Sequence, residues 1–244
     1  MDICLYAINL DRSIDRWERI SLRAAALKIP IVRVSAVDGV NMPVKSFVDC
    51  DETRFERNNG RKMLAGEYGC YRSHLKALEI ILASGCSAAI IVEDDIEILP
   101  DLLLRAQHAL DAVPKADVVK FFNHRTVGFC LVAKSASGDD IGRAAHGPLG
   151  SSACYVVTRP GAKRLLDGIR IMEYPLDIAL ERGWASGAEV YTTRSNVTSP
   201  LKEESTIATR EIYRSVKFHW SQRFKTYGVR IIEALRRLHY ALSG

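Results

Sequence analysis

Two hydrophobic patterns alternate along most of the chain. Short runs in which every position is apolar, such as residues 88–92, are typical of strands buried on both faces of a sheet. The longer segments between these runs have apolar residues three or four positions apart, which is the period of an amphipathic helix. A chain in which strands and helices alternate in this way is expected to form an α/β fold with a mostly parallel central sheet flanked by helices.

The patterns also give approximate bounds for the elements. Strands are expected at residues 2–9, 31–34, 88–92, 117–122, 153–158 and 189–192. Helices are expected at residues 13–27, 66–84, 101–113 and 160–166, with a short one beginning at 174–177. Residues 127–132 and the turn after them suit an antiparallel ribbon. Residues 41–63 are interpreted as a loop that holds one short helix at most.

Three acidic residues, Glu93, Asp94 and Asp95, directly follow the run at 88–92. Ligands of parallel sheets bind just beyond the carboxyl ends of the strands, so these acids are expected at the ligand site. Crowded carboxylates repel one another unless a cation lies between them, and Mg²⁺ and Mn²⁺ prefer oxygen ligands. The three acids are therefore candidate metal ligands, with N-terminal capping of the next helix as the alternative.

Polar side chains also follow the first two predicted strands. Asn9, Arg12 and Arg16 lie at the end of the first strand and on the helix after it. The planar guanidinium of arginine suits a phosphate or a nucleotide edge, although both arginines could instead pair with neighbouring acids on a solvated helix face. Asp38 precedes a glycine, and it either presents its carboxylate to a ribose or a base edge or only forms the turn.

The helix expected from residue 66 begins with the segment GEYGCYRSH (66–74). Its glycines, Gly66 and Gly69, allow the backbone to approach a ligand closely. Ser73 and His74 lie two turns into this helix, and His74 shares a face with apolar residues. His74 is therefore either a hydrogen-bonded core residue or a ligand-binding residue.

Asp177 stands at the start of the short helix that follows Pro175. Capping of that helix is the default interpretation of an aspartate in this position. The functional interpretation is a general base, and Glu173 is the competing candidate for that role.

Residues 208–244 have a different character from the rest of the chain. They hold eight Lys and Arg residues and two acidic ones, with apolar residues recurring every three to four positions. This pattern predicts a basic amphipathic helix, or a helix pair interrupted near Gly228. Such a tail suits an anionic membrane surface, and a helix docked on the preceding domain is the alternative. We therefore divide the chain into a domain at 1–207 and a tail at 208–244.

The composition narrows the protein class. The 244 residues are 48% apolar and 26% charged, as in ordinary soluble domains. Six cysteines without paired spacing argue against a zinc ribbon or a disulfide framework and favour a reducing cytoplasm. A signal peptide is not expected, and no segment reaches the roughly 18 apolar residues of a membrane span. Nucleic-acid binding is not expected either, because no recognition fold accompanies the basic tail.

Taken in order, these motifs resemble glycosyltransferase family 25, which includes bacterial lipopolysaccharide galactosyltransferases and collagen galactosyltransferases. The resemblance spans about residues 2–207, whereas residues 121–146 and the tail follow no alignable family pattern. The segments that carry it are INLDRSIDR (8–16), VDG (37–39), GEYGCYRSH (66–74), IIVEDD (90–95), SSACYVVTRPGAKRLL (151–166) and YPLDIAL (174–180).

The resemblance implies a GT-A-type fold and transfer of galactose or glucose from a UDP-sugar to an acceptor hydroxyl, with inversion. It implies that Asp177 is the base and that Mn²⁺ or Mg²⁺ is held chiefly by Asp95, with Glu93 or Asp94 assisting. The residues that it places around the substrates are Asn9, Arg12, Arg16, Asp38, Gly66, Glu67, Ser73, His74 and Asp94.

The resemblance implies two further features. One is a third metal ligand, for which His146 and His219 are the histidines considered. Residues 201–210, which include Ser205 and Thr206, resemble a family segment that closes over the site.

The expected function is that of a cytoplasmic enzyme, peripheral on the cytoplasmic face of the inner membrane, that adds a hexose to a lipopolysaccharide, lipooligosaccharide or other surface glycan. Its expected partners are a UDP-sugar, a lipid-linked glycan acceptor and an anionic membrane surface. The alternative is a non-catalytic sugar-nucleotide-binding or scaffold protein of a glycan-assembly complex. Metal-dependent phosphoryl transfer or hydrolysis is a second alternative, which gives residues 66–74 no role.

Overall fold

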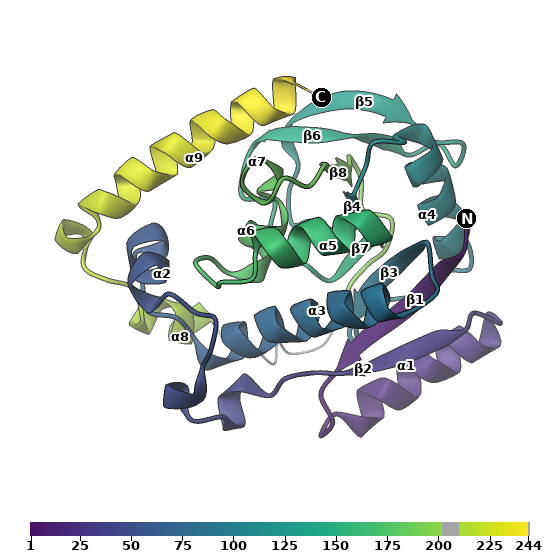
Figure 1. The fold of residues 1–244 in the computed structure, drawn as a ribbon, viewed down its shortest axis with the longest axis horizontal. Coiled ribbons are helices and arrows are strands. Elements are labelled where there is room, and N and C mark those ends of the chain that lie inside the picture. Colours follow the sequence, from purple (N-terminus) through teal and green to yellow (C-terminus); the bar gives the residue numbers. More distant parts are fainter. Residues whose placement is uncertain (202–209, 244) are drawn as a thin grey trace.

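The computed structural model describes residues 1–201 and 210–243, and within them the chain is a mixed α/β fold built on one eight-stranded sheet (Figure 1). The strand order is β2-β1-β3-β7-β4-β8-β6-β5. The strands are β1 Ile3–Asn9, β2 Ile31–Ser35, β3 Ala88–Glu93, β4 Val118–Lys120, β5 Val127–Lys134, β6 Asp140–His146, β7 Cys154–Thr158 and β8 Val190–Thr193. The helices are α1 Ile14–Ala26, α2 Glu52–Asn59, α3 Ala65–Ala83, α4 Leu102–Ala112, α5 Arg159–Gly168, α6 Leu176–Leu180, α7 Gly183–Ser186, α8 Arg210–Ser215 and α9 Phe224–Leu242. Three short 3₁₀ turns are η1 Gly39–Asn41, η2 Val44–Ser46 and η3 Trp220–Gln222.

The first half of the sheet is parallel, as the sequence predicts. β1 lies between β2 and β3 and pairs with both in parallel, so that Leu5 faces Ile31 on one side and Ile90 on the other. The carboxyl ends of these three strands therefore meet at one edge of the sheet. Asn9, Ser35 and Glu93 end the strands there.

The second half of the sheet is mainly antiparallel, so the prediction of a mostly parallel sheet is wrong. β7 runs antiparallel between β3 and β4, β5 and β6 form an antiparallel hairpin, and β6 is antiparallel to β8. Within the described residues, four of the seven neighbouring pairs are antiparallel. β7 is almost entirely buried, so its apolar run reports burial on both faces, which is the same for either strand direction.

Helices cover both faces of the sheet. Successive residues of a strand point to opposite faces, so Ile90 packs in the core with α1 and α4, whereas Ile91 packs in the core with α3, α5 and α6. β3 is the most enclosed strand, since Ala88 to Val92 are all fully buried. Its acidic end thus emerges from the centre of the molecule.

The C-terminal helix α9 is continuous through Gly228, which corrects the predicted interruption there. The chain instead leaves α8 at Ser215 and enters α9 at Phe224. α9 starts beside α2 and ends along β6 (Figure 1). Thr226 Oγ1 donates to the Arg57 carbonyl at 2.7 Å, and Arg182 pairs with Glu233 at 2.6 Å. The tail is therefore docked, as the alternative interpretation expected.

The predicted boundary at 207/208 stays a prediction, because it falls outside the described residues, as do Ser205 and Thr206. No helix in the described part of the chain is long and apolar enough to cross a membrane.

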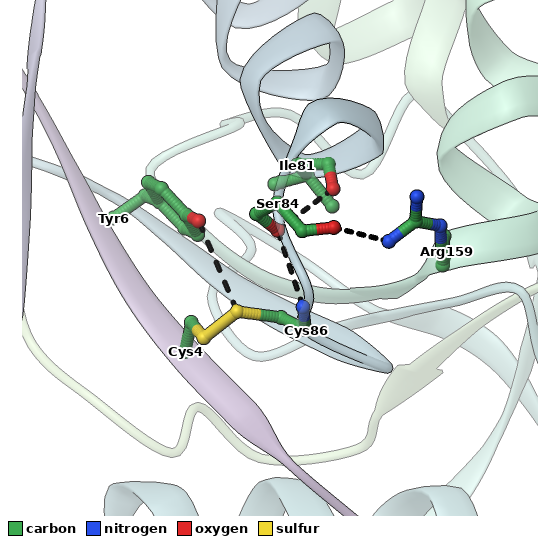
Figure 2. The surroundings of a disulfide bond; sticks show 6 residues. All are labelled: Cys4, Tyr6, Ile81, Ser84, Cys86 and Arg159. Carbon is green, nitrogen blue, oxygen red and sulfur yellow. Dashed lines mark hydrogen bonds between the residues drawn. A yellow bond between two sulfur atoms is a disulfide. The ribbon is translucent and has the colours of Figure 1, made fainter.

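A disulfide bond joins Cys4 of β1 to Cys86 in the turn before β3 (Figure 2). Their Cα atoms are 6.1 Å apart, although 82 positions separate them in the sequence. The Ser84 hydroxyl donates to the Ile81 carbonyl and accepts from the Cys86 amide, which shapes this turn. The prediction against disulfide bonds is therefore wrong, because parallel pairing of β1 with β3 brings together two cysteines that sequence spacing does not relate.

Candidate functional site

The acids at the end of β3 have three different environments. Asp94 lies against the end of β1, where Asn9 Nδ2 donates to its Oδ2 at 2.7 Å and Arg16 donates to its Oδ1 at 3.2 Å. Arg33 in turn donates twice to Asn9 Oδ1, at 3.0 and 2.6 Å. Burial raises the pKa of Asp94 in spite of these bonds. The side chains of Asn9 and Arg16 thus fix the position of the Asp94 carboxylate.

Glu93 is held from the opposite side. Ser152 Oγ donates to Glu93 Oε1 at 2.9 Å, and His74 Nε2 lies 3.5 Å from the same oxygen. Burial raises the pKa of Glu93, but the imidazole of His74 and the Ser152 hydroxyl outweigh it, so that the pKa is lowered overall. Glu93 is therefore ionised at neutral pH.

Of the three acids, Asp95 has the fewest groups nearby that stabilise a negative charge. Burial and the charges of Glu93 and Asp94 together raise its pKa from 3.8 to about 6, although Arg16 acts in the opposite direction. A carboxylate in such surroundings gains from a nearby cation. Asp95 is therefore the acid of this group that a bound cation would stabilise most.

A first cavity, which we call the Asp38 cavity, opens at the carboxyl ends of β1 and β2. Its empty volume is about 570 Å³. Arg12 forms an ion pair with Asp38 in its wall. The predicted site residues that line this cavity are Arg12, Asp38, Gly66, Ser73, His74, Glu93 and Asp94.

The wall of the Asp38 cavity is shaped by close packing of α3 on the turn after β2. Ser73 Oγ accepts from the Val37 amide at 2.8 Å and donates to the Gly69 carbonyl at 2.6 Å. A Cβ atom on Gly69 would lie 2.5 Å from the Val37 carbonyl oxygen. Glycine at 69 therefore serves the packing of this turn, which holds Asp38 at the cavity.

A second cavity, the Asp177 cavity, lies on the other side of the acids and has an empty volume of about 1340 Å³. Asp177 lies in the first turn of α6, whose N-cap is Pro175, and its Oδ1 accepts from the Ile178 amide at 2.9 Å. Glu67 pairs there with Arg61 and also accepts from the Leu64 amide. The predicted site residues that line this cavity are Glu67, Glu93, Asp95 and Asp177.

The two cavities meet at Cys70 and Glu93, which line both. A molecule in each cavity would therefore contact the other next to the acids of β3. Of the predicted residues, only Asn9 and Arg16 line neither cavity among the described residues, and both act through Asp94.

The competing candidates lie elsewhere. Glu173 pairs with Arg54 at 2.6 Å, His146 lines a separate cavity beside α9, and the Nδ1 of His219 lies 2.8 Å from Ser221 Oγ. The structure gives none of them a place in the walls described above, so Asp177 is the better placed carboxylate.

Several residues of the site were missed at the sequence level. These are Arg61, Cys70, Phe122, His124, Ser152 and Tyr213, all in the wall of the Asp177 cavity. Ser152 precedes β7 and comes to the acids because β7 is antiparallel to β3, whereas His124 follows β4, which runs in the same direction as β3 and ends at the same edge of the sheet. A parallel β7 would have placed Ser152 at the opposite edge. The position of His124 after a predicted strand and the position of Cys70 within the 66–74 motif were signals that the sequence did offer.

Two groups of three potential metal-binding side chains converge within the described residues. One, Asp2 with Cys4 and Cys86, is occupied by the disulfide bond. The other is Cys70, His74 and Glu93. Asp95 belongs to neither group. A metal site at Glu93 and Asp95 would therefore have these two carboxylates, which lie in the wall of the Asp177 cavity, as its ligands.

Comparison with known proteins gives one family match. The model of a family described as glycosyltransferase family 25 (LPS biosynthesis protein) matches residues 3–180. No curated protein matches the chain.

Two solved structures are similar to this chain over most of its length. One is a glycosyltransferase involved in the glycosylation of the major capsid of PBCV-1, with 6% identity, a TM-score of 0.43, and coverage of 95% of this chain and 100% of that one. The other is a mycobacterial protein, with 12% identity, a TM-score of 0.39, and coverage of 96% of this chain and 74% of that one.

Proposed function

The chain belongs to glycosyltransferase family 25, and from this premise we propose that it transfers galactose or glucose from a UDP-sugar to a hydroxyl of a lipopolysaccharide, lipooligosaccharide or other surface glycan. The observation that supports this most is the meeting of two cavities at Glu93. A donor in one cavity and an acceptor in the other would have their reacting atoms side by side.

The Asp38 cavity suits the nucleotide. Asp38 can accept hydrogen bonds from ribose hydroxyls, and Arg12 beside it can donate to a phosphate or a base edge. The cavity also leads to the acids of β3, where the diphosphate of a nucleotide sugar would lie. In this proposal the larger Asp177 cavity takes the hexose and the acceptor.

A divalent metal, Mn²⁺ or Mg²⁺, is part of the proposal. Glu93 and Asp95 are carboxylates of one cavity wall, and their repulsion adds to the effect of burial in raising the pKa of Asp95. This donor set fits a hard cation, which these two residues would hold. When bound, the metal supplies positive charge that stabilises the diphosphate as a leaving group.

Asp177 is the proposed general base. Its carboxylate takes the proton of the acceptor hydroxyl while the hydroxyl oxygen forms a bond to the anomeric carbon. The bond from that carbon to the diphosphate oxygen breaks on the opposite face, and its electron pair leaves with UDP. The anomeric configuration is thereby inverted. Arg61 and Glu67 are paired in the same wall and would orient the sugar or acceptor.

Contact with an anionic membrane is the second part of the proposal, and it is supported by the outer face of η3 and α9. This face exposes Trp220, Phe224, Ile231, Ile232, Leu235 and Leu242, each more than half exposed. Basic residues such as Arg223, Lys225 and Arg236 flank it. A basic amphipathic helix of this kind binds the interface of anionic bilayers, which is where a lipid-linked acceptor is found. The enzyme would then be peripheral on the cytoplasmic face of the inner membrane, a location that rests on the tail alone, because the Cys4–Cys86 bond removes the argument from cysteine usage.

The transfer is tested with the full chain, UDP-galactose or UDP-glucose, Mn²⁺ and de-O-acylated lipooligosaccharide. We expect the acceptor to gain the mass of one hexose residue. Asp177→Asn should lower kcat by about 100- to 10,000-fold, because removal of a general base has an effect of this size.

The same variant distinguishes an enzyme from a scaffold. Asp177→Asn should bind the UDP-sugar as tightly as the native chain, because the base does not contact the nucleotide. Asp167→Asn, an exposed aspartate on α5, is the matched control and should keep full activity. Unchanged transfer by Asp177→Asn would remove Asp177 as the base, and absence of transfer with every UDP-hexose would favour the scaffold.

A further inference from the structure

Three side chains of different chemistry meet where the Asp38 and Asp177 cavities join. The potential ligand atoms of Cys70, His74 and Glu93 all lie within 4.8 Å of one another. Cys70 and His74 are four residues apart on α3, so their side chains lie on the same face of the helix, and Glu93 ends the strand β3 beside it. Two residues with this spacing can bind one ion together, and a carboxylate from a second element adds a third ligand.

The imidazole of His74 is already oriented for this role. His74 is 1% exposed, and its Nδ1 lies 3.0 Å from the hydroxyl of Tyr155. Its Nε2 has no hydrogen-bond partner among the described residues, although it faces Glu93 Oε1 at 3.5 Å. A metal-binding histidine typically uses its second ring nitrogen in this way, to bond an outer partner that fixes the ring. When Nδ1 donates to Tyr155, the lone pair of Nε2 remains for a cation.

The contact of Nε2 with Glu93 at 3.5 Å is longer than a normal hydrogen bond, so it satisfies this buried atom poorly. A buried polar atom without a partner destabilises a protein by about 1–3 kcal/mol, so such atoms usually have a role or a missing partner. The space beside Nε2 is bounded by a thiol and a carboxylate, both of which can act as metal ligands. A cation is the partner that all three groups share.

We propose that Cys70, His74 and Glu93 form a binding site for a borderline-soft divalent cation, for which Zn²⁺ is the best match. Thiolate and imidazole ligands favour Zn²⁺, whereas Mg²⁺ and Mn²⁺ favour oxygen ligands. Three protein ligands leave one tetrahedral position for another molecule, as in zinc sites that take part in chemistry. Cys70 and Glu93 line both cavities, so this position is accessible to small molecules.

This site shares Glu93 with the Glu93–Asp95 pair proposed above for a hard cation, but its other two ligands are different. It uses a thiol and an imidazole that the sugar-transfer proposal does not require. The zinc site is also tested without nucleotide or acceptor, so the failure of one proposal is separate from the failure of the other.

The experiment uses Co²⁺ as a spectroscopic substitute for Zn²⁺. The full chain is freed of metal with a chelator, the chelator is removed, and Co²⁺ is added stepwise under anaerobic conditions. We expect a thiolate-to-cobalt charge-transfer band in the near ultraviolet and strong visible bands of tetrahedral cobalt, both saturating at one equivalent. Zn²⁺ should abolish the bands at one equivalent, whereas a hundredfold excess of Mg²⁺ should not.

Matched variants locate the site. Cys70→Ser is close in size and should lose the charge-transfer band and bind Co²⁺ at least tenfold more weakly. Cys130→Ser, a half-buried cysteine on β5, should behave as the native chain does. His74→Gln should lose the visible bands, and circular dichroism establishes that each variant is folded.

Two results would overturn the proposal. One is cobalt binding without a charge-transfer band, since the thiolate would then not be a ligand. The other is a band that persists in Cys70→Ser, because the thiolate would then belong to a different cysteine.

Discussion

Glu93, Asp94 and Asp95 are chemically similar neighbours with different pKa values. The pKa of Glu93 is lowered overall, whereas those of Asp94 and Asp95 are raised, and that of Asp95 reaches about 6. The difference follows from what each carboxylate contacts, since Asp94 is held by Asn9 and Arg16 and Glu93 by Ser152. At the residue scale, side chains of the protein therefore stabilise Glu93 and Asp94, whereas Asp95 is the acid that a bound cation would stabilise most.

This arrangement predicts that Asp95 destabilises the metal-free protein. Its folded pKa of about 6 lies above its ordinary value of 3.8, so ionisation costs stability as the pH rises through 6. Asp95→Asn removes that charge. At pH 8 with a chelator, we expect Asp95→Asn to raise the free energy of unfolding by about 1–2 kcal/mol, after allowance for solvent screening.

The gain should decrease as the pH falls from 6 and disappear near pH 3, where Asp95 is mostly protonated in both folded and unfolded states. Urea unfolding at pH 3, 6 and 8 measures this, with Asp111→Asn on the exposed side of α4 as the control. A gain that does not change with pH, or a loss of stability at every pH, would contradict the argument.

At the element scale, hydrophobic periodicity was a sound guide to where helices and strands lie and a poor guide to their direction. The predicted strands at 2–9, 31–34 and 88–92 are β1, β2 and β3, and their parallel pairing follows from the helices that connect them. β7 carries the same kind of apolar run and is antiparallel. The run reports that a strand is covered on both faces, whereas its direction depends on a connection that crosses the molecule.

For α9 too, the sequence predicts the type of element but not how it packs on the rest of the protein. Its sequence predicts an amphipathic helix, and the structure docks one edge of it on the α/β body through contacts such as Tyr240 with Val190. The outer face remains apolar, with Phe224 and Ile231 each more than 60% exposed. Docking and membrane contact are therefore compatible, because they use different faces of one helix.

The membrane proposal predicts a loss of binding when the outer face is made polar. Phe224→Ser combined with Ile231→Ser should weaken binding to vesicles that contain phosphatidylglycerol at least tenfold, because both side chains leave water on insertion. The melting temperature should be nearly unchanged, since neither side chain is buried in the protein.

Leu22→Ser combined with Leu104→Ser is the matched control, because both leucines are exposed on other helices. Vesicle co-sedimentation of the full chain measures binding. Equal binding by both double variants would remove α9 as the membrane contact.

At the scale of the whole molecule, the sequence located most of the candidate residues and little of their arrangement. The order of its motifs led to the correct family, and most of the residues named for the site line one of two cavities. Ser152 could not be found in this way, because antiparallel β7 brings it to the acids from a distant position. The Cys4–Cys86 bond was missed for a different reason, because the spacing of cysteines in the sequence does not show which of them the parallel pairing of β1 with β3 brings together.

If the cavities that meet at the acids of β3 hold a UDP-sugar together with a divalent metal, UDP-galactose or UDP-glucose should bind only when Mn²⁺ is present. Calorimetric titration of each sugar nucleotide into the full chain, with and without Mn²⁺, measures this. We expect one binding site that requires Mn²⁺, is lost in Asp95→Ala and is unchanged in Asp111→Ala. Binding that needs no metal would contradict the role of Asp95, and absence of binding by either sugar nucleotide would contradict the proposed function itself.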